Sequence, residues 1–204
     1  MLRDAALASA GLLNRAVGGP PVKPFQPDGV WEEMFMGRFH YEPSEGPAQY
    51  RRTLYAFWRR AVAPTFLFDS AQRRVCEVRP ARTNTPLQAL TLLNDASQLA
   101  AAHALAARAA TEALDPPGRV HGITQAVLLR PPSPREESIL IREYERALGH
   151  YRDHPDQAAR LLRGTAIELA AVPPNSTTPD APERASLLIV ASLVLNLDET
   201  LSHE

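Results

Sequence analysis

A long apolar run near the C-terminus most constrains what this chain can fold into. The segment ASLLIVASLVL, residues 185–195, carries no charge and places apolar side chains nearly all round a helix. Because such a helix must be covered on every side, we expect it at the centre of a helical bundle. Asp180 followed by Glu183 forms a cap pair, and the predicted helix covers residues 184–201.

A second strong signal is RTNTPLQALTLLND, residues 82–95, in which Thr85 is followed by Pro86 and then by Gln88. In a capping box, the threonine hydroxyl accepts from the backbone amide of the glutamine, and the glutamine side chain accepts from the backbone amide of the threonine. The proline between them suits the first helical position. The segment therefore predicts the start of a helix, which we expect over residues 85–112.

Two further start signals divide the rest of the chain. Asp95 has a glutamine three residues later, so the long helix is expected either to break or to kink near residue 94. Ser133, with proline next and Glu136 three residues on, predicts a helix that runs to about residue 151. Helical spacing of apolar residues predicts the remaining helices, which cover residues 2–13, 48–62, 119–129 and 155–163.

Nothing in the sequence marks a β-sheet, so the predicted class is all-α. We expect an irregular bundle of about six to eight helices joined by long Pro-rich loops. One such loop is GGPPVKPFQPDG at residues 18–29, which contains four prolines. The predicted organisation is one domain over residues 1–204, with a basic, loop-rich segment at 1–82 and a helical bundle at 83–204.

The charge is balanced overall but uneven along the chain. A formal net charge of −1 gives no global electrostatic case for nucleic acid or a membrane surface. No run approaches the ~18 apolar residues of a bilayer-spanning helix, so no transmembrane segment is expected. Residues 51–82, in contrast, hold eight arginines against two acidic residues, an excess of six positive charges.

This local excess predicts a binding face for an anionic partner, because arginine forks suit sulfate, phosphate and carboxylate groups. Aromatic residues interleave with the arginines, Trp58 among them. The alternative is that these arginines face water or pair with the acidic C-terminal half. The partner is expected to be an acidic polysaccharide or another domain of the same protein. The predicted binding residues are Arg73, Arg74, Arg79, Arg82, Asn84, Asn94 and Trp58.

A competing hypothesis is a hydrolase acting on carbohydrate or ester substrates. Its catalytic side chains would be Asp69, Arg82, Asn84 and Asp95, converging on one cleft with a carboxylate beside an arginine. Helix capping alone also explains Asp95. No helix cap requires Arg82, Asn84 or Asn94.

Metal and cofactor chemistry find little support. A single cysteine, Cys76, excludes an internal disulfide, a four-cysteine zinc site and a CxxCH haem attachment. His150 and His154 have a metal-compatible spacing, but Pro155 favours a helix end there and no third ligand is evident. No metal or cofactor is therefore expected. The N-terminus lacks the pattern of an export signal, so the chain as written is expected to stay in the cytoplasm.

Several stretches together resemble a known family, the planctomycete-specific domain of unknown function, family 1553. They span nearly the whole chain in the family's order, and RTNTPLQAL is the most specific of them. The matching stretches are VKPFQPDGVWEEM (22–34), YRRTLYAFWRR (50–60), FDSAQRRVCEVRPARTNTPLQALTLLND (68–95), RPPSPREE (130–137) and LNLDE (195–199).

The resemblance implies the C-terminal part of that domain, truncated at its N-terminus. Parent proteins of the family are typically large, exported envelope proteins, often with a cytochrome-c-like module. The family has no agreed catalytic residues, so the resemblance implies no mechanism. The leading hypothesis is thus a non-enzymatic binding or scaffolding module. The alternatives are the hydrolase and a non-functional gene fragment, which would expose a large apolar surface.

Overall fold

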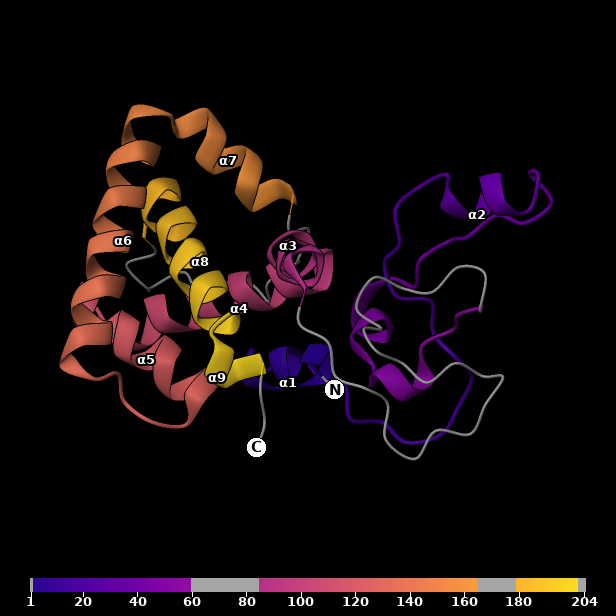
Figure 1. Ribbon diagram of the computed structural model, residues 1–204, viewed down its shortest axis with the longest axis horizontal. Helices are drawn as coiled ribbons and strands as arrows, with labels where there is room; N and C mark the ends of the chain where they lie inside the picture. The colour runs from indigo at the N-terminus through magenta and orange to yellow at the C-terminus, as the bar shows by residue number, and fades with distance from the viewer. Residues whose placement is uncertain (1, 60–84, 165–178, 202–204) are drawn as a thin grey trace.

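The computed structural model describes residues 2–59, 85–164 and 179–201, and the predictions that fall between these ranges lie outside it. The described residues contain helices and no strand, which confirms the all-α class (Figure 1). Nine α-helices and two 3-10 helices are present there, and the short α2 and α9 raise the count above the predicted one. The elements are α1 (Leu2–Ser9), α2 (Val30–Met34), η1 (Gly46–Tyr50), η2 (Thr53–Tyr55), α3 (Pro86–Asn94), α4 (Ala96–Glu112), α5 (Pro116–Leu128), α6 (Pro134–Asp153), α7 (Pro155–Gly164), α8 (Ala181–Leu195) and α9 (Asp198–Leu201).

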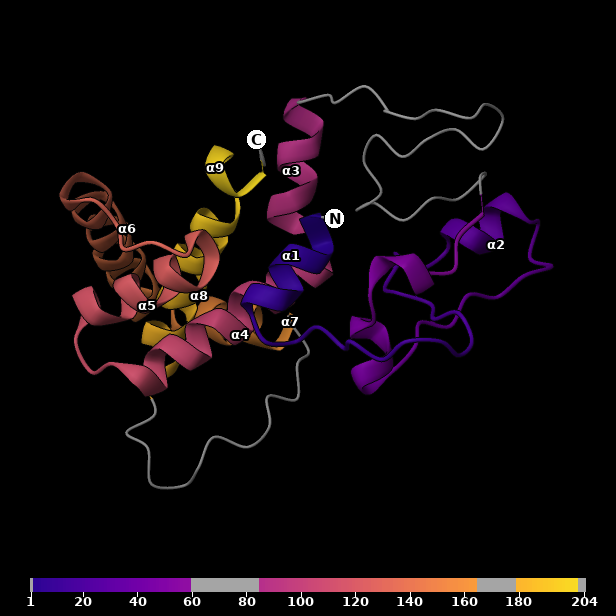
Figure 2. The same ribbon diagram turned by 90° about the horizontal axis from the view of Figure 1, so that it is seen from below.

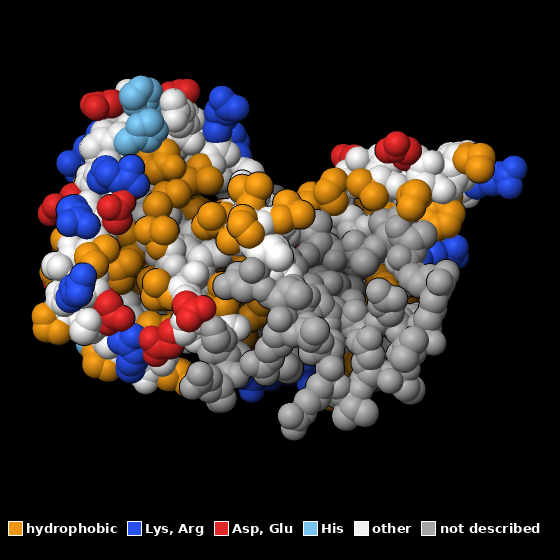
Figure 3. Space-filling model, in the orientation of Figure 1, with side chains coloured by type: hydrophobic (Ala, Val, Ile, Leu, Met, Phe, Trp, Pro, Cys, Tyr) orange, Lys and Arg blue, Asp and Glu red, His pale blue; other side chains and the backbone are white. Residues whose placement is uncertain are grey.

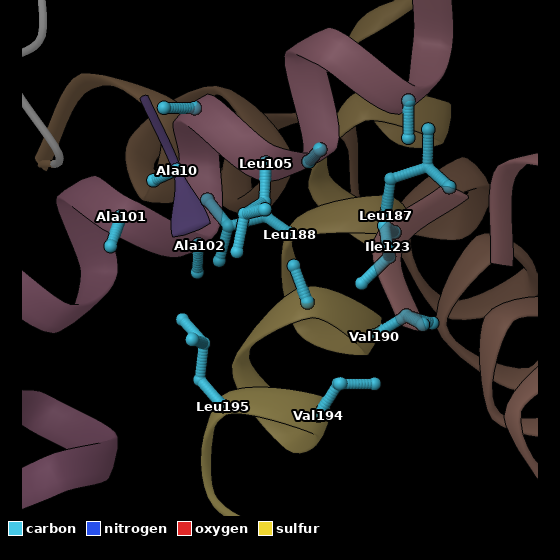
Figure 4. Packing of buried hydrophobic residues seen from close by; sticks show 14 of the residues in the cluster. Ala10, Ala101, Ala102, Leu105, Ile123, Leu187, Leu188, Val190, Val194 and Leu195 are labelled. Atoms are coloured by element: carbon cyan, nitrogen blue, oxygen red, sulfur yellow. The ribbon is translucent and has the colours of Figure 1, made fainter. Parts of the chain in front are cut away.

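Helix α8 lies at the centre of the bundle, as its apolar sequence predicts. It packs against α4, α5, α6 and α7, and Figure 1 shows α6 beside it and α7 across its end. Leu187, Leu188, Val190 and Val194 are fully buried, and Figure 4 shows Leu188 beside Leu105 of α4 and Leu187 beside Ile123 of α5. Hydrophobic burial around α8 is therefore the main stabilising contribution to the bundle.

Helix α4 contributes mainly alanines, rather than large side chains, to the core. Ala101, Ala102, Ala106 and Ala109 are each at most 2 % exposed. Because the distance between helix axes depends on the side chains at the contact, small residues let α4 lie close to α8. Leu105 fills the remaining space between them (Figure 4).

Both start signals in the segment 82–95 are confirmed. The Thr85 hydroxyl accepts a hydrogen bond from the Gln88 amide at 3.3 Å, and the Gln88 side chain accepts from the Thr85 amide at 2.8 Å. Helix α3 ends at Asn94, and the Asp95 carboxylate accepts from the amides of residues 97 and 98 to start α4. Two helices therefore stand where a single helix with a kink near residue 94 was the alternative.

A capping box also begins α6, and it is joined to an ion-pair network. The Glu136 carboxylate accepts from the Ser133 amide at 2.7 Å and from both Arg130 Nη atoms, at 2.8 and 2.9 Å. The same guanidinium reaches Glu199 at the start of α9, with its Nε 2.9 Å from Glu199 Oε1. The network ties the end of α5 to α6 and α9.

This network predicts a specific dependence of stability on pH. The Arg130 hydrogen bonds, followed by those from Ser133, lower the pKa of Glu136 from 4.5 to about 2. Because the pKa falls on folding, the stabilisation is complete above pH 4.5 and is lost as pH drops toward 2. We expect urea unfolding to show the wild type more stable than Glu136→Gln at pH 6, with the difference shrinking below about pH 4.5. A difference that stays constant from pH 6 to pH 2.5 would contradict this cause.

The helix predicted over residues 48–62 is wrong for its described part. Residues 46–50 and 53–55 form the 3-10 turns η1 and η2, and the chain is extended after them. Leu54, which would lie on the apolar face of the predicted helix, is 79 % exposed. The reason is tertiary: Arg3 binds the carbonyls of Gln49 and Arg51, and Asp4 binds the Thr53 amide, so these groups are not available to a helix ladder.

Other helix ends differ from the prediction for local reasons. Helix α1 ends at Ser9 rather than at residue 13, because Gly11 adopts a left-handed φ of 75°. Helix α5 begins at Pro116 rather than at residue 119, since the Asp115 carboxylate caps it. Helix α8 ends at Leu195, and the Thr200 hydroxyl then binds a carbonyl of its last turn.

Candidate functional site

Residues 14–59, here called the N-terminal lobe, are tied to the bundle through α1. The buried Arg3 side chain donates to the Arg51 carbonyl at 2.8 Å and to the Gln49 carbonyl at 2.5 Å. The Asp4 carboxylate accepts from both the amide and the hydroxyl of Thr53, at 2.8 and 2.6 Å. Figures 1 and 2 both show the lobe beside α1 with α2 away from the bundle. Two adjacent charged residues of α1 therefore position the lobe.

Arg51 is used inside the lobe rather than at its surface. Only 7 % of the residue is exposed, and its guanidinium donates to the Pro20 carbonyl at 2.9 Å and to the Gly18 carbonyl. The same group lies 3.9 Å from the centre of the Tyr55 ring. This arginine of the predicted basic face holds the Pro-rich loop and is not available to a partner.

An aromatic cluster forms the core of the lobe. Trp31 is fully buried, and its ring centre lies between 5.0 and 5.7 Å from those of four other rings. Its Nε1 donates to the Gln26 side chain at 2.6 Å, which satisfies the indole in the interior. The members of the cluster are Trp31, Phe35, Phe39, Tyr41 and Phe57.

Two cations lie over the outer rings of this cluster. The Lys23 Nζ is 5.9 Å from the centre of the Phe39 ring, and the Arg59 Cζ is 5.5 Å from the same centre. Arg59 also lies 5.3 Å from the Phe35 ring. Each contact is worth about 0.5–1 kcal/mol at an exposed position. None of the carboxylates in the described ranges lies within ion-pair distance of Lys23 or Arg59.

This arrangement can hold an anion next to an apolar ring. A guanidinium that lies over a ring can still donate two parallel hydrogen bonds to a sulfate or carboxylate. Arg59 is exposed, and Phe35 and Phe39 are half-buried. The surface thus offers two positive charges and ring edges in one place.

Three of the residues predicted for a site fall within the described ranges, and they do not share one location. Trp58 is half-buried beside Arg59 in the lobe. The Asn94 side chain donates to the Leu90 carbonyl of its own helix at 2.8 Å. Asp95 caps α4, at the junction with α3. The other predicted residues, which lie outside the described ranges, are Asp69, Arg73, Arg74, Arg79, Arg82 and Asn84.

Sequence reasoning missed Lys23 as a candidate binding residue and counted Arg59 only within the basic excess of residues 51–82. The signal was present in the spacing of the aromatic residues Trp31, Phe35 and Phe39, which recur every four positions. Lys23 and Arg59 reach the same rings because residues 57–59 lie beside residues 22–24. A backbone hydrogen bond from the Phe57 amide to the Val22 carbonyl joins these two segments.

Two other candidate sites lie elsewhere in the described residues. The rings of His150 and His154 stack with their centres 4.7 Å apart, and no group of three or more potential metal ligands occurs in the described ranges. A surface pocket of about 190 Å³ lies between α1, α5 and α9, and no predicted site residue lines it. No helix in the described ranges is long and apolar enough to cross a membrane.

Comparisons with known proteins bear on the family. Searches of curated proteins and of solved structures give no match. The model of a family described as a protein of unknown function (DUF1553) matches residues 1–144. That match includes the N-terminal lobe, helices α1 to α5 and the first half of α6. The chain therefore belongs to the DUF1553 family of proteins of unknown function.

Proposed function

We propose that this chain is a non-enzymatic binding module whose N-terminal lobe holds an anionic partner through Lys23 and Arg59. The observation that carries the proposal is the placement of both cations over the Phe39 ring, 5.9 and 5.5 Å from its centre. Ring packing restrains each of the two cationic groups against the same ring, so less conformational freedom is lost when an anion binds.

The chemistry of the surface favours an acidic polysaccharide as the partner. Such a polymer presents carboxylate or sulfate groups that arginine binds with two parallel hydrogen bonds. Its sugar rings have apolar faces that can pack on the exposed parts of Phe35 and Phe39. More positive charge in the same part of the sequence comes from Arg73, Arg74, Arg79 and Arg82. Only their charge, and not their position, is used in this proposal.

The hydrolase hypothesis gains no support from the residues that are described. Asp95, the one member of its predicted catalytic set within them, uses its carboxylate to accept the amides of residues 97 and 98. Those bonds give the carboxylate a structural role as the cap of α4.

Binding to an immobilised sulfated polysaccharide such as heparin tests the proposal. The wild type is expected to bind, with affinity that falls as salt is added because the contact is electrostatic. Lys23→Glu combined with Arg59→Glu should weaken binding at least about tenfold, which corresponds to about 1.4 kcal/mol. The matched control is Arg142→Glu combined with Arg152→Glu, which makes the same charge change on exposed positions of α6.

Two results would contradict the proposal. One is equal weakening by the lobe variant and the α6 control, which would show that only net charge matters. The other is unchanged binding after the lobe variant. A triple variant that reverses Arg73, Arg74 and Arg79 then shows whether those arginines carry the binding instead. Uncharged dextran serves as the reference polymer, and the wild type should not be retained on it.

A further inference from the structure

The pocket between α1, α5 and α9 has an apolar floor. Ala6 and Leu195, which line it, are only 6 % and 4 % exposed, and Leu128 adds a half-buried side chain. The volume of the pocket is about 190 Å³, and an apolar cavity of roughly 150 Å³ is enough to hold benzene. A single benzene-sized ring therefore fits this pocket.

Three helices end at the pocket. Ser9 is the last residue of α1, Leu128 the last of α5 and Leu195 the last of α8, and all three line it. The C-terminal end of a helix carries about half a negative charge, which favours a cation nearby and disfavours an anion. None of these three helices has a basic residue in its last turn to offset that charge. The backbone around the pocket therefore favours a positively charged group.

A carboxylate adds negative charge at the mouth of the pocket. Among the described residues that line it, Glu199 alone is charged, and its side chain is 52 % exposed. Hydrogen bonds from Arg130 lower the pKa of Glu199, so this carboxyl group is ionised at neutral pH. The same guanidinium also pairs with Glu136, and two carboxylates against one arginine leave one net negative charge. Figure 3 shows acidic side chains beside hydrophobic ones at the lower edge of the bundle, where Figure 1 places α9.

We infer that this pocket binds a small organic ammonium ion, whose apolar body fills the floor and whose cationic group faces Glu199. Volume determines the size of the body, and the helix ends and the carboxylate determine the sign of the charge. The site is separate from the cation–aromatic surface of the lobe and has the opposite charge. It does not rest on the proposed function.

Titration of the chain with benzylamine, followed by its amide signals in two-dimensional NMR, tests the inference. Benzylamine has one ring and one ammonium group, and a ligand of this size is expected to bind with a dissociation constant of about 1 mM. Amide signals of the residues that line the pocket should shift saturably. Benzyl alcohol has the same shape without the charge and should bind about threefold more weakly, which is the scale of one exposed ion pair. Benzoate, an anion, should not bind.

Two pairs of variants separate the cavity from the charge. Ala5→Leu fills the pocket from α1 and should weaken benzylamine binding at least about tenfold. Ala8→Leu, at an exposed alanine of α1 that does not line the pocket, should bind like the wild type. Glu199→Gln should reduce the preference for benzylamine over benzyl alcohol while both still bind. Glu145→Gln, at an exposed position of α6, should keep that preference.

Four outcomes would overturn the inference. The first is benzyl alcohol or benzoate binding to the wild type as tightly as benzylamine. The second is a set of shifts that does not saturate or that falls on other residues, which would show only a general attraction to surface carboxylates. The third is equal binding by Ala5→Leu and Ala8→Leu, and the fourth is an unchanged preference in Glu199→Gln. Circular dichroism checks that each variant folds. If Glu199→Gln does not fold, the three ligands and the two α1 variants still decide the result.

Discussion

Replacing Leu188 with alanine is expected to lower the free energy of unfolding by about 2–5 kcal/mol. Leu188 is fully buried in α8, where it belongs to the main core with residues of α4 and α5 (Figure 4). Alanine would leave a cavity that the surrounding helices fill only in part, so both transfer energy and packing are lost. Urea unfolding followed by circular dichroism measures the change.

Leu129→Ala is the control for this prediction, because that leucine is 82 % exposed and its loss should cost less than about 0.5 kcal/mol. Equal losses for the two variants would contradict the central position of α8. A cooperative unfolding transition of the 204-residue chain would in addition count against the gene-fragment hypothesis.

Replacing Trp31 with alanine is expected to remove about 3–5 kcal/mol of stability from the N-terminal lobe. The residue is fully buried, contacts four aromatic rings and donates to Gln26. The aromatic cluster is separate from the main core around α8. The loss should therefore open the lobe without unfolding the bundle.

Hydrogen exchange measured by mass spectrometry distinguishes the two regions. In Trp31→Ala, amides of residues 22–57 should exchange faster, while those of α4 and α8 keep their protection. Phe25→Ala is the matched control, since that ring is 46 % exposed and lies outside the cluster. Equal loss of protection in α8 would show that lobe and bundle unfold as one unit.

The helical bundle was largely predictable because its signals are local. The caps at Thr85, Asp95 and Ser133 depend on residues no more than three positions away. The central place of α8 follows from its own uncharged sequence, without knowledge of its neighbours. Patterns of this kind determine a helix before its tertiary contacts are known.

The N-terminal lobe was not predictable in the same way. Tyr50, Phe57 and Trp58 have the spacing of a helix face, yet Arg3 and Asp4 bind the backbone of residues 49–53 from almost fifty positions away. Local periodicity carries no information about such contacts, and here the tertiary hydrogen bonds outweigh the helical propensity.

The candidate site shows the same division. Positive charge beside aromatic rings was expected for this part of the chain, and Arg59 fits that expectation. Arg51 does not, because its guanidinium donates hydrogen bonds to carbonyls of the Pro-rich loop. Lys23 was missed because its rings, Phe39 and Tyr41, lie sixteen or more residues away. Composition thus indicated the type of surface, and only the fold decided which cations form it.

The central claim is that an anionic polymer contacts the rings beneath Lys23 and Arg59. Fluorine NMR of the chain labelled with 4-fluorophenylalanine tests it directly, because the sequence has only six phenylalanines. Substitution of Phe35 or Phe39 by leucine assigns their signals. On titration with a short sulfated oligosaccharide, the Phe35 and Phe39 signals should shift saturably, and added salt should reverse the shift. Unshifted Phe35 and Phe39 signals at a saturating oligosaccharide concentration would contradict the claim.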